Sequence, residues 1–440
     1  MKKDIELALG EFRRRAPLYE KAKRYYKGRH NLAFASEKFA NTFGSLFREF
    51  ALNLCPAVCD STADRLKITG FAIERQPDFS RNTDGDKSDA DLRRIEKAIG
   101  RIRSENNFEI LTDEIHSEAL TAGDAYLIIW PDAEGRPAFY PQRAENCIAI
   151  YDEDGRREMK FAAKIWPAGG SRLRLNLYYH DRTERYISTD AEPGRAAKDA
   201  AGFKPFIDGD GIYRVENPYG MIPVFHFANN PGIGNFGSSE LEAVMPIQDG
   251  MNKAVLDMLV AMEVSAYRQR WAAGIEIQFD KEGNPRPPFK AGIDHLWLAE
   301  NPDAKFGDFA AADLEQFLKV KDGFRIDIAS VSATPLYYLM PQAGAYPSGE
   351  SLRKAETRFL AKVKNRQATF GVRWARAMEF ALRIGGFAGV RLTTRWEDAA
   401  NESERERLET LEIKRRIGLS AKQALREAGY GEEQTGETAE

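Results

Sequence analysis

The sequence from Ser239 to Tyr267 reads S-E-L-E-A-V-M-P-I-Q-D-G-M-N-K-A-V-L-D-M-L-V-A-M-E-V-S-A-Y. Ser239 and Glu242 have the Ser-x-x-Glu spacing of a capping box, which predicts that a helix begins at Ser239. At 100° per residue, the apolar side chains of this helix cover an arc of roughly 160°. Pro246 predicts a kink or a restart within the helix. So wide an apolar arc predicts a long helix packed against several neighbours, which can be other copies of the chain.

Length and composition indicate a folded protein of more than one domain. The chain has 440 residues, 43% hydrophobic and 30% charged, and its formal net charge is −3. This length exceeds one ordinary core, and the charge excludes a global basic field that would attract nucleic acid. No apolar run reaches about 18 residues, and no signal peptide follows Met1, so no membrane partner is expected. Three cysteines are too few for a disulfide framework, which favours a reducing compartment.

The order of the predicted elements indicates an α+β fold. A single long stretch of period two, at residues 123–227, predicts a mainly antiparallel β region between helical segments. The remaining predicted elements are helices over 3–30, 43–66, 92–122, 312–324, 350–384, 401–417 and 420–428, a small β module over 271–311, an irregular loop over 332–349 and a strand over 390–396.

Two helices carry charges of opposite sign. The helix that follows Ser239 has an acidic stripe opposite its apolar arc, formed by Glu242, Asp249, Asp257 and Glu263. The helix over 350–384 is basic, and five of its cations are Arg353, Lys354, Arg358, Lys362 and Arg366. These cations form either a solvated face or a contact with acidic partners, which are phosphates or the acidic stripe of a neighbouring subunit.

The loop over 332–349 is uncharged, aromatic and rich in glycine and proline. A buried irregular loop is costly because its backbone polar groups need partners. The loop is therefore either a flexible surface lid or an element packed at an interface.

Local motifs give little support for catalysis or for a cofactor. Residues 232–237 form a G-x-G-x-x-G between a strand and a helix, but the second parallel strand with a terminal acid that a dinucleotide site requires is missing. Cys55 and Cys59 lie one helical turn apart without matching ligands, which favours buried thiols over a metal site. His226 alternates with phenylalanines and is interpreted as an ordinary strand residue. The sequence predicts no catalytic residue, no metal and no cofactor.

Several stretches resemble, in order along nearly the whole chain, the portal proteins of tailed double-stranded-DNA bacteriophages. G-S-S-E-L-E at 237–242 and Q-D-G-M-N-K at 248–253 are similar to the stem-helix signature of that family. The other similar stretches are Y-Y-K-G-R-H at 25–30, A-D-R-L-K-I-T-G-F at 63–71, P-S-G-E-S-L-R at 347–353 with K-N-R-Q at 364–367, and G-L-S at 418–420 with A-L-R-E-A-G-Y at 424–430.

The resemblance implies a portal architecture. Its expected parts are an N-terminal region and α/β wing over 1–236, a stem helix over 237–270, a clip over 271–311, a second stem helix over 312–331, a tunnel loop with the long helix over 332–384, a return strand of the wing over 385–400, and a short helical crown with a polar tail over 401–440.

The resemblance also implies a function without chemistry of its own. Such proteins form a ring of about twelve subunits, closed by heterologous contacts, at one capsid vertex, where a channel passes double-stranded DNA during packaging and ejection. The implied partners are the large subunit of terminase at the clip, the major capsid and scaffolding proteins, and a head-completion or adaptor protein. The protein is expected in the virion after assembly in the host cytoplasm.

On this resemblance, five residues of the loop are expected to line the narrowest part of the channel: Tyr337, Tyr338, Met340, Gln342 and Tyr346. An uncharged lining suits a channel that passes DNA, because each phosphate contact by lysine or arginine adds affinity through counterion release. The acidic stripe is expected to face either the channel or a neighbouring subunit.

Two alternatives predict other behaviour. A nucleotide-binding enzyme would hold its ligand at Gly232, Gly234 and Gly237 and would bind NAD or ATP. An adaptor-type interaction protein would use the basic helix to bind acidic partners and would form a defined complex of low order without a ring.

Overall fold

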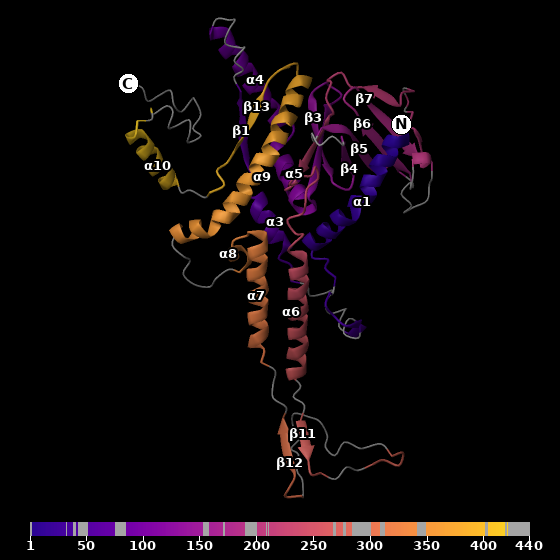
Figure 1. Cartoon of the computed structure of the whole chain (residues 1–440), viewed down its shortest axis with the longest axis vertical. Helices are drawn as coiled ribbons and strands as arrows, with labels where there is room; N and C mark the ends of the chain where they lie inside the picture. Colours follow the sequence, from indigo (N-terminus) through magenta and orange to yellow (C-terminus); the bar gives the residue numbers. More distant parts are fainter. Residues whose placement is uncertain are drawn as a thin grey trace. The chain divides into compact units, whose positions relative to one another are not determined.

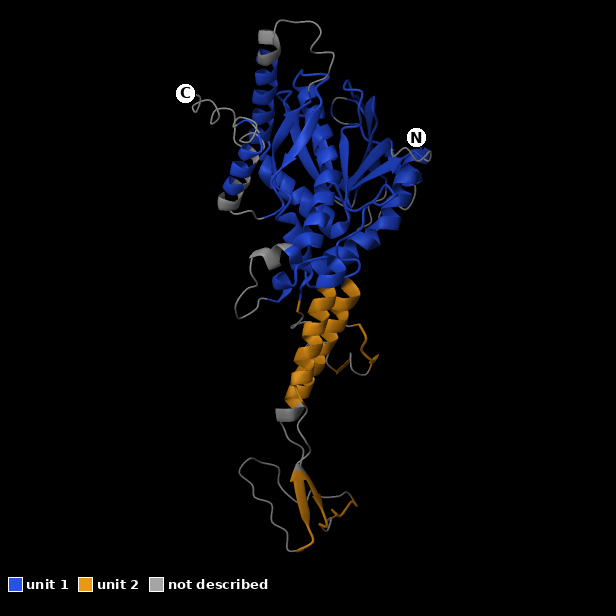
Figure 2. Ribbon diagram, turned by 60° about the vertical axis from the view of Figure 1, so that its left-hand side comes forward, with its two compact units in different colours: residues 1–28, 53–244, 329–440 blue, residues 29–52, 245–328 orange. Residues whose placement is uncertain are grey.

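The chain folds into two compact units, each built from segments that are distant in the sequence (Figures 1 and 2). Unit 1 comprises residues 1–28, 53–244 and 329–440, and unit 2 comprises residues 29–52 and 245–328. The computed structural model describes residues 2–31, 33–37, 41–42, 52–74, 85–152, 158–169, 172–189, 200–207, 209, 211–266, 270–275, 279–283, 301–308, 313–340, 349–400, 404–418 and 420.

A three-stranded antiparallel sheet forms the core of unit 1. Its strand order is β10 (Val224–Ala228), β2 (Asp124–Pro131) and β3 (Pro137–Arg143), with Phe227 opposite Ala125. On one face, Leu127 and Phe227 pack in the same cluster as side chains of α5 (Phe108–Ala122) and α9 (Gly349–Ile384). On the other face, Tyr126 packs against a second sheet. Because both faces of β2 are covered, this strand is apolar without alternation.

The second sheet of unit 1 has a helix on its outer face. Its strands run in the order β4 (Cys147–Tyr151), β5 (Met159–Pro167), β6 (Leu173–Tyr178), β7 (Arg182–Ser188) and β8 (Phe203–Pro205), and β9 (Arg214–Glu216) also pairs with β7. Helix α1 (Lys2–Tyr26) places Ile5 and Leu9 against Ile148 and Phe161 of this sheet. The antiparallel β region predicted over 123–227 is confirmed.

A small third sheet joins distant parts of unit 1. It pairs β1 (Ile68–Ile73) with β13 (Leu392–Trp396) in antiparallel order, and α9 packs beside β13. The other helices of the unit are α3 (Cys55–Ala63), α4 (Gly85–Glu105), the single turn α8 (Leu336–Leu339) and α10 (Glu404–Arg416). Pro56 lies in the first turn of α3, where its missing N–H costs no hydrogen bond.

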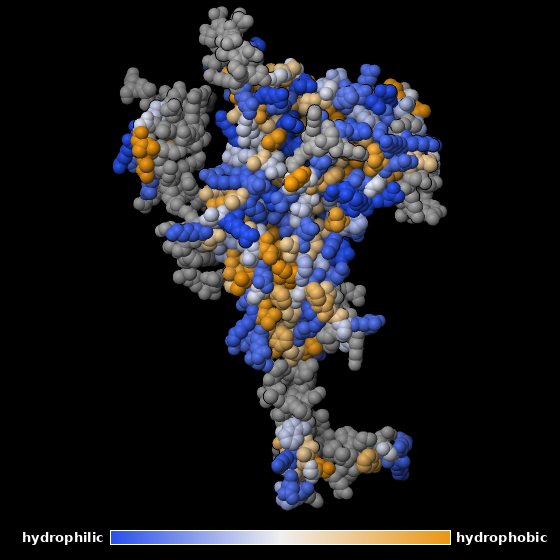
Figure 3. All heavy atoms as spheres, in the orientation of Figure 1, coloured by the Kyte–Doolittle hydropathy of each residue, from blue (hydrophilic) through white to orange (hydrophobic). Residues whose placement is uncertain are grey.

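Unit 2 contains two long helices and a two-stranded sheet. Helix α6 (Met245–Ala266) lies beside α7 (Glu315–Ser332), whose last residues belong to unit 1, and a Cβ added at Gly250 would lie 3.2 Å from the Phe324 ring. Strand β11 (Arg270–Ala273) pairs with β12 (Lys305–Asp308), inside the predicted β module. Figure 3 shows apolar side chains gathered on the visible face of α6 and α7. None of the described helices meets the length and hydropathy needed to cross a membrane.

The helix predicted to begin at Ser239 begins at Met245 instead, so this prediction is wrong by six residues. The Ser239 hydroxyl donates to the Thr121 carbonyl (2.6 Å) and accepts the Leu241 N–H (3.0 Å), so it closes a turn rather than a helix. The kink or restart predicted at Pro246 is not found: this proline stands in the first turn of α6, so the helix starts there.

Two further boundaries differ from the sequence expectations. Helix α7 continues to Ser332, eight residues beyond the predicted end at Phe324. The loop predicted over 332–349 contains the helical turn α8, and Leu339 in this turn is buried. Residues 341–348 of this loop, and the helix predicted over 420–428 apart from Ser420, lie outside the described residues.

The close approach at Gly237 gives a direct test of the packing in unit 1. A Cβ at this position would lie 2.0 Å from the Gly123 carbonyl oxygen and 2.5 Å from the Asn229 nitrogen. We therefore expect Gly237→Ala to destabilise the protein by about 2 kcal/mol or more, because backbone has to move. Gly10→Ala is the control, since nothing lies within 4 Å of the added methyl in α1, and a slight stabilisation is expected. Equal thermal unfolding midpoints for the two variants would contradict this packing.

Candidate functional site

A buried carboxylate, Glu240, is held by two cations of the basic helix. Arg366 donates to it through Nη2 (2.7 Å) and Nε (3.1 Å), and Lys362 Nζ lies 3.5 Å from its second oxygen. Asn229 adds a hydrogen bond of 3.1 Å. The three charged side chains are between 7% and 10% exposed, so the ion pairs are almost fully removed from water.

The charges of this cluster depend on one another. Burial acts to raise the pKa of the Glu240 carboxyl, but Lys362 and Arg366 outweigh it and hold this pKa below its ordinary value. Burial lowers the pKa of the Lys362 ammonium, and Glu240 opposes that shift. Removing the carboxylate would leave two buried cations without an anion, which is far more costly than losing a surface pair.

The same helix also caps the C-terminal end of α7. Lys362 Nζ donates to the Ser332 carbonyl (2.9 Å), and Arg358 Nη1 donates to the Ser330 carbonyl (3.0 Å). The last carbonyls of a helix lack intrahelical partners and carry partial negative charge, so cations stabilise this end. Three of the five predicted basic residues therefore act inside their own chain.

Helical turn α8 is fastened to three other segments through Arg65. The Arg65 guanidinium donates to the Tyr338 hydroxyl (3.1 Å) and to the Ala399 carbonyl (3.0 Å), and lies 3.8 Å from the Glu356 carboxylate. The Tyr337 hydroxyl donates to Glu356. Burial, and then Glu356, raise the pKa of Tyr337, so this phenol stays protonated as a donor. These contacts fix the start of the predicted tunnel loop on α9.

A second buried network holds the turn that precedes Glu240. Asp124 accepts the Gly237 N–H (2.7 Å) and the Tyr19 hydroxyl (2.7 Å), and its Oδ1 lies 2.7 Å from His226 Nε2. The other ring nitrogen of His226 lies 2.6 Å from the Tyr151 hydroxyl. His226 is a residue of strand β10, as interpreted from the sequence, and through Asp124 and Tyr151 it also links three strands with the 229–244 turn.

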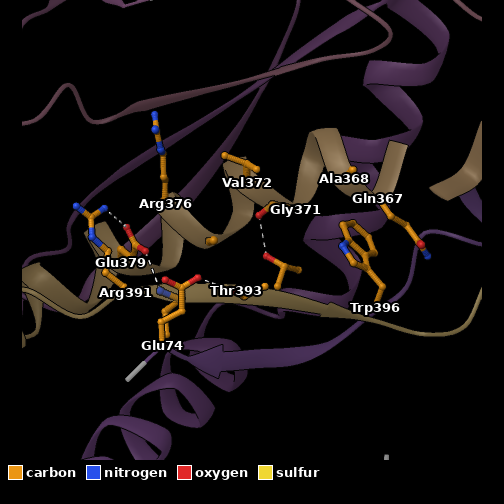
Figure 4. Close-up of a pocket in the computed structure, with 13 residues that line it drawn as sticks. Glu74, Gln367, Ala368, Gly371, Val372, Arg376, Glu379, Arg391, Thr393 and Trp396 are labelled. Carbon is orange, nitrogen blue, oxygen red and sulfur yellow. Dashed lines mark hydrogen bonds and ion pairs between the residues drawn. The ribbon is translucent and has the colours of Figure 1, made fainter. Parts of the chain in front are cut away.

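A cleft of about 410 Å³ lies between α9 and β13 (Figure 4). Several of its polar groups bond to one another: Glu379 accepts the Leu392 N–H (2.8 Å) and lies 3.8 Å from Arg391, and Thr393 donates to Glu74 (2.6 Å). These bonded side chains therefore offer few free donors or acceptors to a charged ligand. Within the described residues, no group of three or more histidine, cysteine, aspartate or glutamate side chains could hold a metal ion.

The structure places the other predicted residues as follows. Glu242 and Glu263 are exposed, and Asp257 of the acidic stripe is paired with Lys253 one turn away. Lys354 is exposed, while the side chain of Arg353 and all of Gln342 and Tyr346 lie outside the described part; Met340 is half-buried. Nothing in a single chain tests whether the loop or the stripe faces a channel, so both predictions stay predictions.

The family of the chain follows from comparison with known proteins. The model of the family "Phage portal protein, SPP1 Gp6-like" matches residues 8–428. The chain belongs to this portal family. The portal protein of Mycobacterium phage D29 is 26% identical over 358 residues, which cover 77% of this chain and 67% of that protein. The portal protein of Mycobacterium phage L5 is 29% identical over 196 residues, covering 42% of this chain and 40% of that protein.

Solved structures of particle necks resemble the portal chain more distantly. A chain from the neck of a native gene transfer agent particle, computed with C12 symmetry, has a TM-score of 0.45 at 14% identity, covering 86% of this chain and 89% of that one. A chain from the neck of the empty particle, computed with C6 symmetry, has a TM-score of 0.46 at 15% identity with the same coverage.

Sequence reasoning missed Glu240 and Asp124 in this portal protein. Glu240 stands two residues before Glu242, which was assigned to the acidic stripe. The cations that pair with Glu240, Lys362 and Arg366, lie more than 120 residues further along the chain. The signal that could have found it is the dense basic pattern of α9 next to an apolar stripe, because cations on a buried face require an anion.

The Glu240 cluster predicts a large effect of one substitution on stability. Glu240→Gln keeps the size of the side chain but removes the negative charge between Lys362 and Arg366. We expect a loss of about 3–5 kcal/mol in the free energy of unfolding, because two buried cations are left unneutralised. Glu242→Gln, at an exposed position, is the control and should change stability by less than about 0.5 kcal/mol. Chemical denaturation of both variants checks this, and similar midpoints would refute the role of Glu240.

The same cluster predicts a pH dependence with a definite sign. The pKa of Glu240 is lower in the folded protein than its ordinary value of 4.5. Its stabilising effect is therefore fully present above about pH 4.5 and is lost as the pH falls through the folded pKa. We expect the stability difference between the wild type and Glu240→Gln to shrink below about pH 4.5. Unfolding midpoints measured from pH 7 to pH 3 check this, and a constant difference would contradict it.

Proposed function

We propose that this portal protein forms a homo-oligomeric ring of about twelve subunits, closed by heterologous contacts, around a channel that conducts double-stranded DNA at one capsid vertex. The observation that carries the proposal is the match to the portal family over residues 8–428. DNA would pass through the ring during packaging and during ejection, and the ring itself would perform no catalysis.

Exposed apolar residues of unit 2 support a ring. Leu318 and Ile326 of α7 are 45% and 51% exposed. At 100° per residue they point roughly 120° and 160° away from Phe324, the side chain that packs on α6. Apolar side chains on the far side of a two-helix pair are expected to be covered by another molecule. A neighbouring copy would cover them in a ring, where each subunit presents two different surfaces.

The parts of the ring are proposed in the order of the chain. Residues 1–236 with 385–400 would form the wing, α6 and α7 the stem, 271–311 the clip and 401–440 a short crown. The large subunit of terminase would dock at the clip during packaging, and a head-completion or adaptor protein would replace it. The major capsid and scaffolding proteins would surround the ring, which would assemble in the host cytoplasm and remain in the virion.

The loop over 332–349, which contains the helical turn α8, is proposed to line the narrowest part of the channel. Its first residues are held on α9 by Arg65 and Glu356, so the loop would project from a rigid base. Tyr337, Tyr338, Met340, Gln342 and Tyr346 carry no charge, and an uncharged lining would let DNA slide because it forms no phosphate contacts. A ring structure with this loop on the outer surface would refute the proposal.

Substitution of Ile326 tests the ring and the face that forms it. We expect Ile326→Asp to reduce ring formation strongly, because the interface would have to bury an unpaired charge. Negative-stain electron microscopy and native mass spectrometry of the purified chain check this.

Gln316→Asp, an exposed polar position on the same helix, is the matched control and should leave assembly unchanged. Circular dichroism should show the same helix content in both variants. Full rings in Ile326→Asp would contradict the role of this face, and a wild type without rings under any condition would contradict the ring itself.

A further inference from the structure

A second cleft, of about 480 Å³, lies between α9 and the glycine-rich turn at residues 230–236. Helix α9 contributes Asn365, Thr369, Arg373 and Arg376, which follow one another at helical spacing and share one face. The opposite wall includes the backbone at Gly232 and Gly234. Packing constrains these two glycines less than Gly237: a Cβ added at Gly234 would lie 3.3 Å from the Pro231 carbonyl oxygen, and one added at Gly232 would have nothing within 4 Å.

The glycines leave this wall of the cleft open. Gly232 has a φ of +57°, a left-handed conformation that side chains other than glycine adopt at a cost, and nothing lies within 4 Å of a Cβ added there. Both Gly232 and Gly234 are exposed. Because a glycine has no side chain, a ligand oxygen can approach its backbone closely, as in known anion-binding turns.

The charged residues that the described part of the chain contributes to this cleft are two cations, Arg373 and Arg376, and none of the described lining residues is acidic. The Asn365 side-chain oxygen accepts a hydrogen bond from Arg366 Nη1 (3.1 Å), which leaves its amide group as a donor for other partners. The chemistry of this lining therefore favours a ligand that accepts several hydrogen bonds and carries negative charge.

The neighbouring cleft between α9 and β13 differs from this one in the charge of its lining. Both clefts share Val372 and Arg376, but the α9–β13 cleft contains Glu74 and Glu379, which are bonded to residues of its own lining. In Figure 4, Arg376 extends away from β13 and from those carboxylates. The Arg376 guanidinium is thus directed away from the carboxylates of the α9–β13 cleft.

We infer that the cleft formed by Gly232, Gly234, Arg373 and Arg376 binds phosphate groups, and that double-stranded DNA supplies them. Guanidinium groups bind phosphate oxygens through paired hydrogen bonds, which lysine cannot reproduce. The choice of DNA rests on the proposed function, while the phosphate chemistry rests on the cleft alone. Each subunit would make one or two contacts, which are weak singly and add up over several subunits.

Fluorescence anisotropy of a labelled DNA duplex of about 20 base pairs, the length scale of a standard binding site, tests the inference on the full chain. We expect Arg376→Gln, and more so the double variant Arg373→Gln/Arg376→Gln, to weaken binding. The affinity should fall about eightfold per arginine at 0.1 M salt, and the slope of log K against log salt should decrease by about one per arginine.

Arg391→Gln is the matched control, because it removes the same charge from an exposed arginine of the neighbouring cleft. It should change the affinity for the duplex by less than about twofold, the size expected for a charge that makes no phosphate contact. An equal loss in this control, or an unchanged affinity in the double variant, would overturn the inference.

Two further measurements separate the source of the phosphate and the role of the ring. Inorganic phosphate and ATP are titrated against the wild type and the double variant. If the wild type binds phosphate or ATP but not the duplex, and the double variant binds neither, the assignment to DNA is overturned. Electron microscopy of each variant reports assembly separately. If the double variant forms no rings but binds the duplex with unchanged affinity, the arginines belong to a subunit contact and the inference is overturned. A wild type that forms no rings would contradict only the proposed function.

Discussion

The buried carboxylate of Glu240 is the constraint on which the junctions of unit 1 depend. A charge taken out of water must be neutralised, and Lys362 with Arg366 does this from one face of α9. Glu240 lies four residues before the chain leaves unit 1 at Val244, and Lys362 also holds Ser332, just after the chain returns at Ala329. One cluster of charge therefore holds two of the four places where the chain passes between unit 1 and unit 2, at Val244 and at Ala329.

Periodicity alone located most of the elements, because apolar spacing reports which side of a helix or strand is buried. It predicted the antiparallel region, the helix over 350–384 and the strand over 390–396, which the structure confirms. It failed at Ser239, where a capping pattern exists but the hydroxyl bonds to Thr121, over a hundred residues earlier. Local sequence describes what a residue can do, and long-range partners decide which option it takes.

The candidate site was harder to predict than the fold for the same reason. The charges of α9 are visible in the sequence, but their partners are not, so the sequence left a solvated face, phosphates or the acidic stripe of a neighbouring subunit as the alternatives. The third possibility, an anion in the same chain, needs a long-range pair, Glu240 with Arg366. The glycine motif divides in a similar way: Gly237 is required by backbone contact, whereas nothing lies within 4 Å of a Cβ added at Gly232.

The placement of cations also bears on how a portal could let DNA pass. A lysine or arginine facing a channel would retain phosphate, and the retention would multiply around a ring. At the base of the proposed tunnel loop the cations are instead neutralised within the subunit: Arg65 lies beside Glu356, and Lys362 and Arg366 hold Glu240. In the proposed channel, the charge that fixes the loop would thereby be withheld from the DNA, and the loop itself could remain uncharged. Rigid anchoring of the loop and weak binding of DNA are thus compatible, because the ion pairs that anchor the loop form between residues of the same chain.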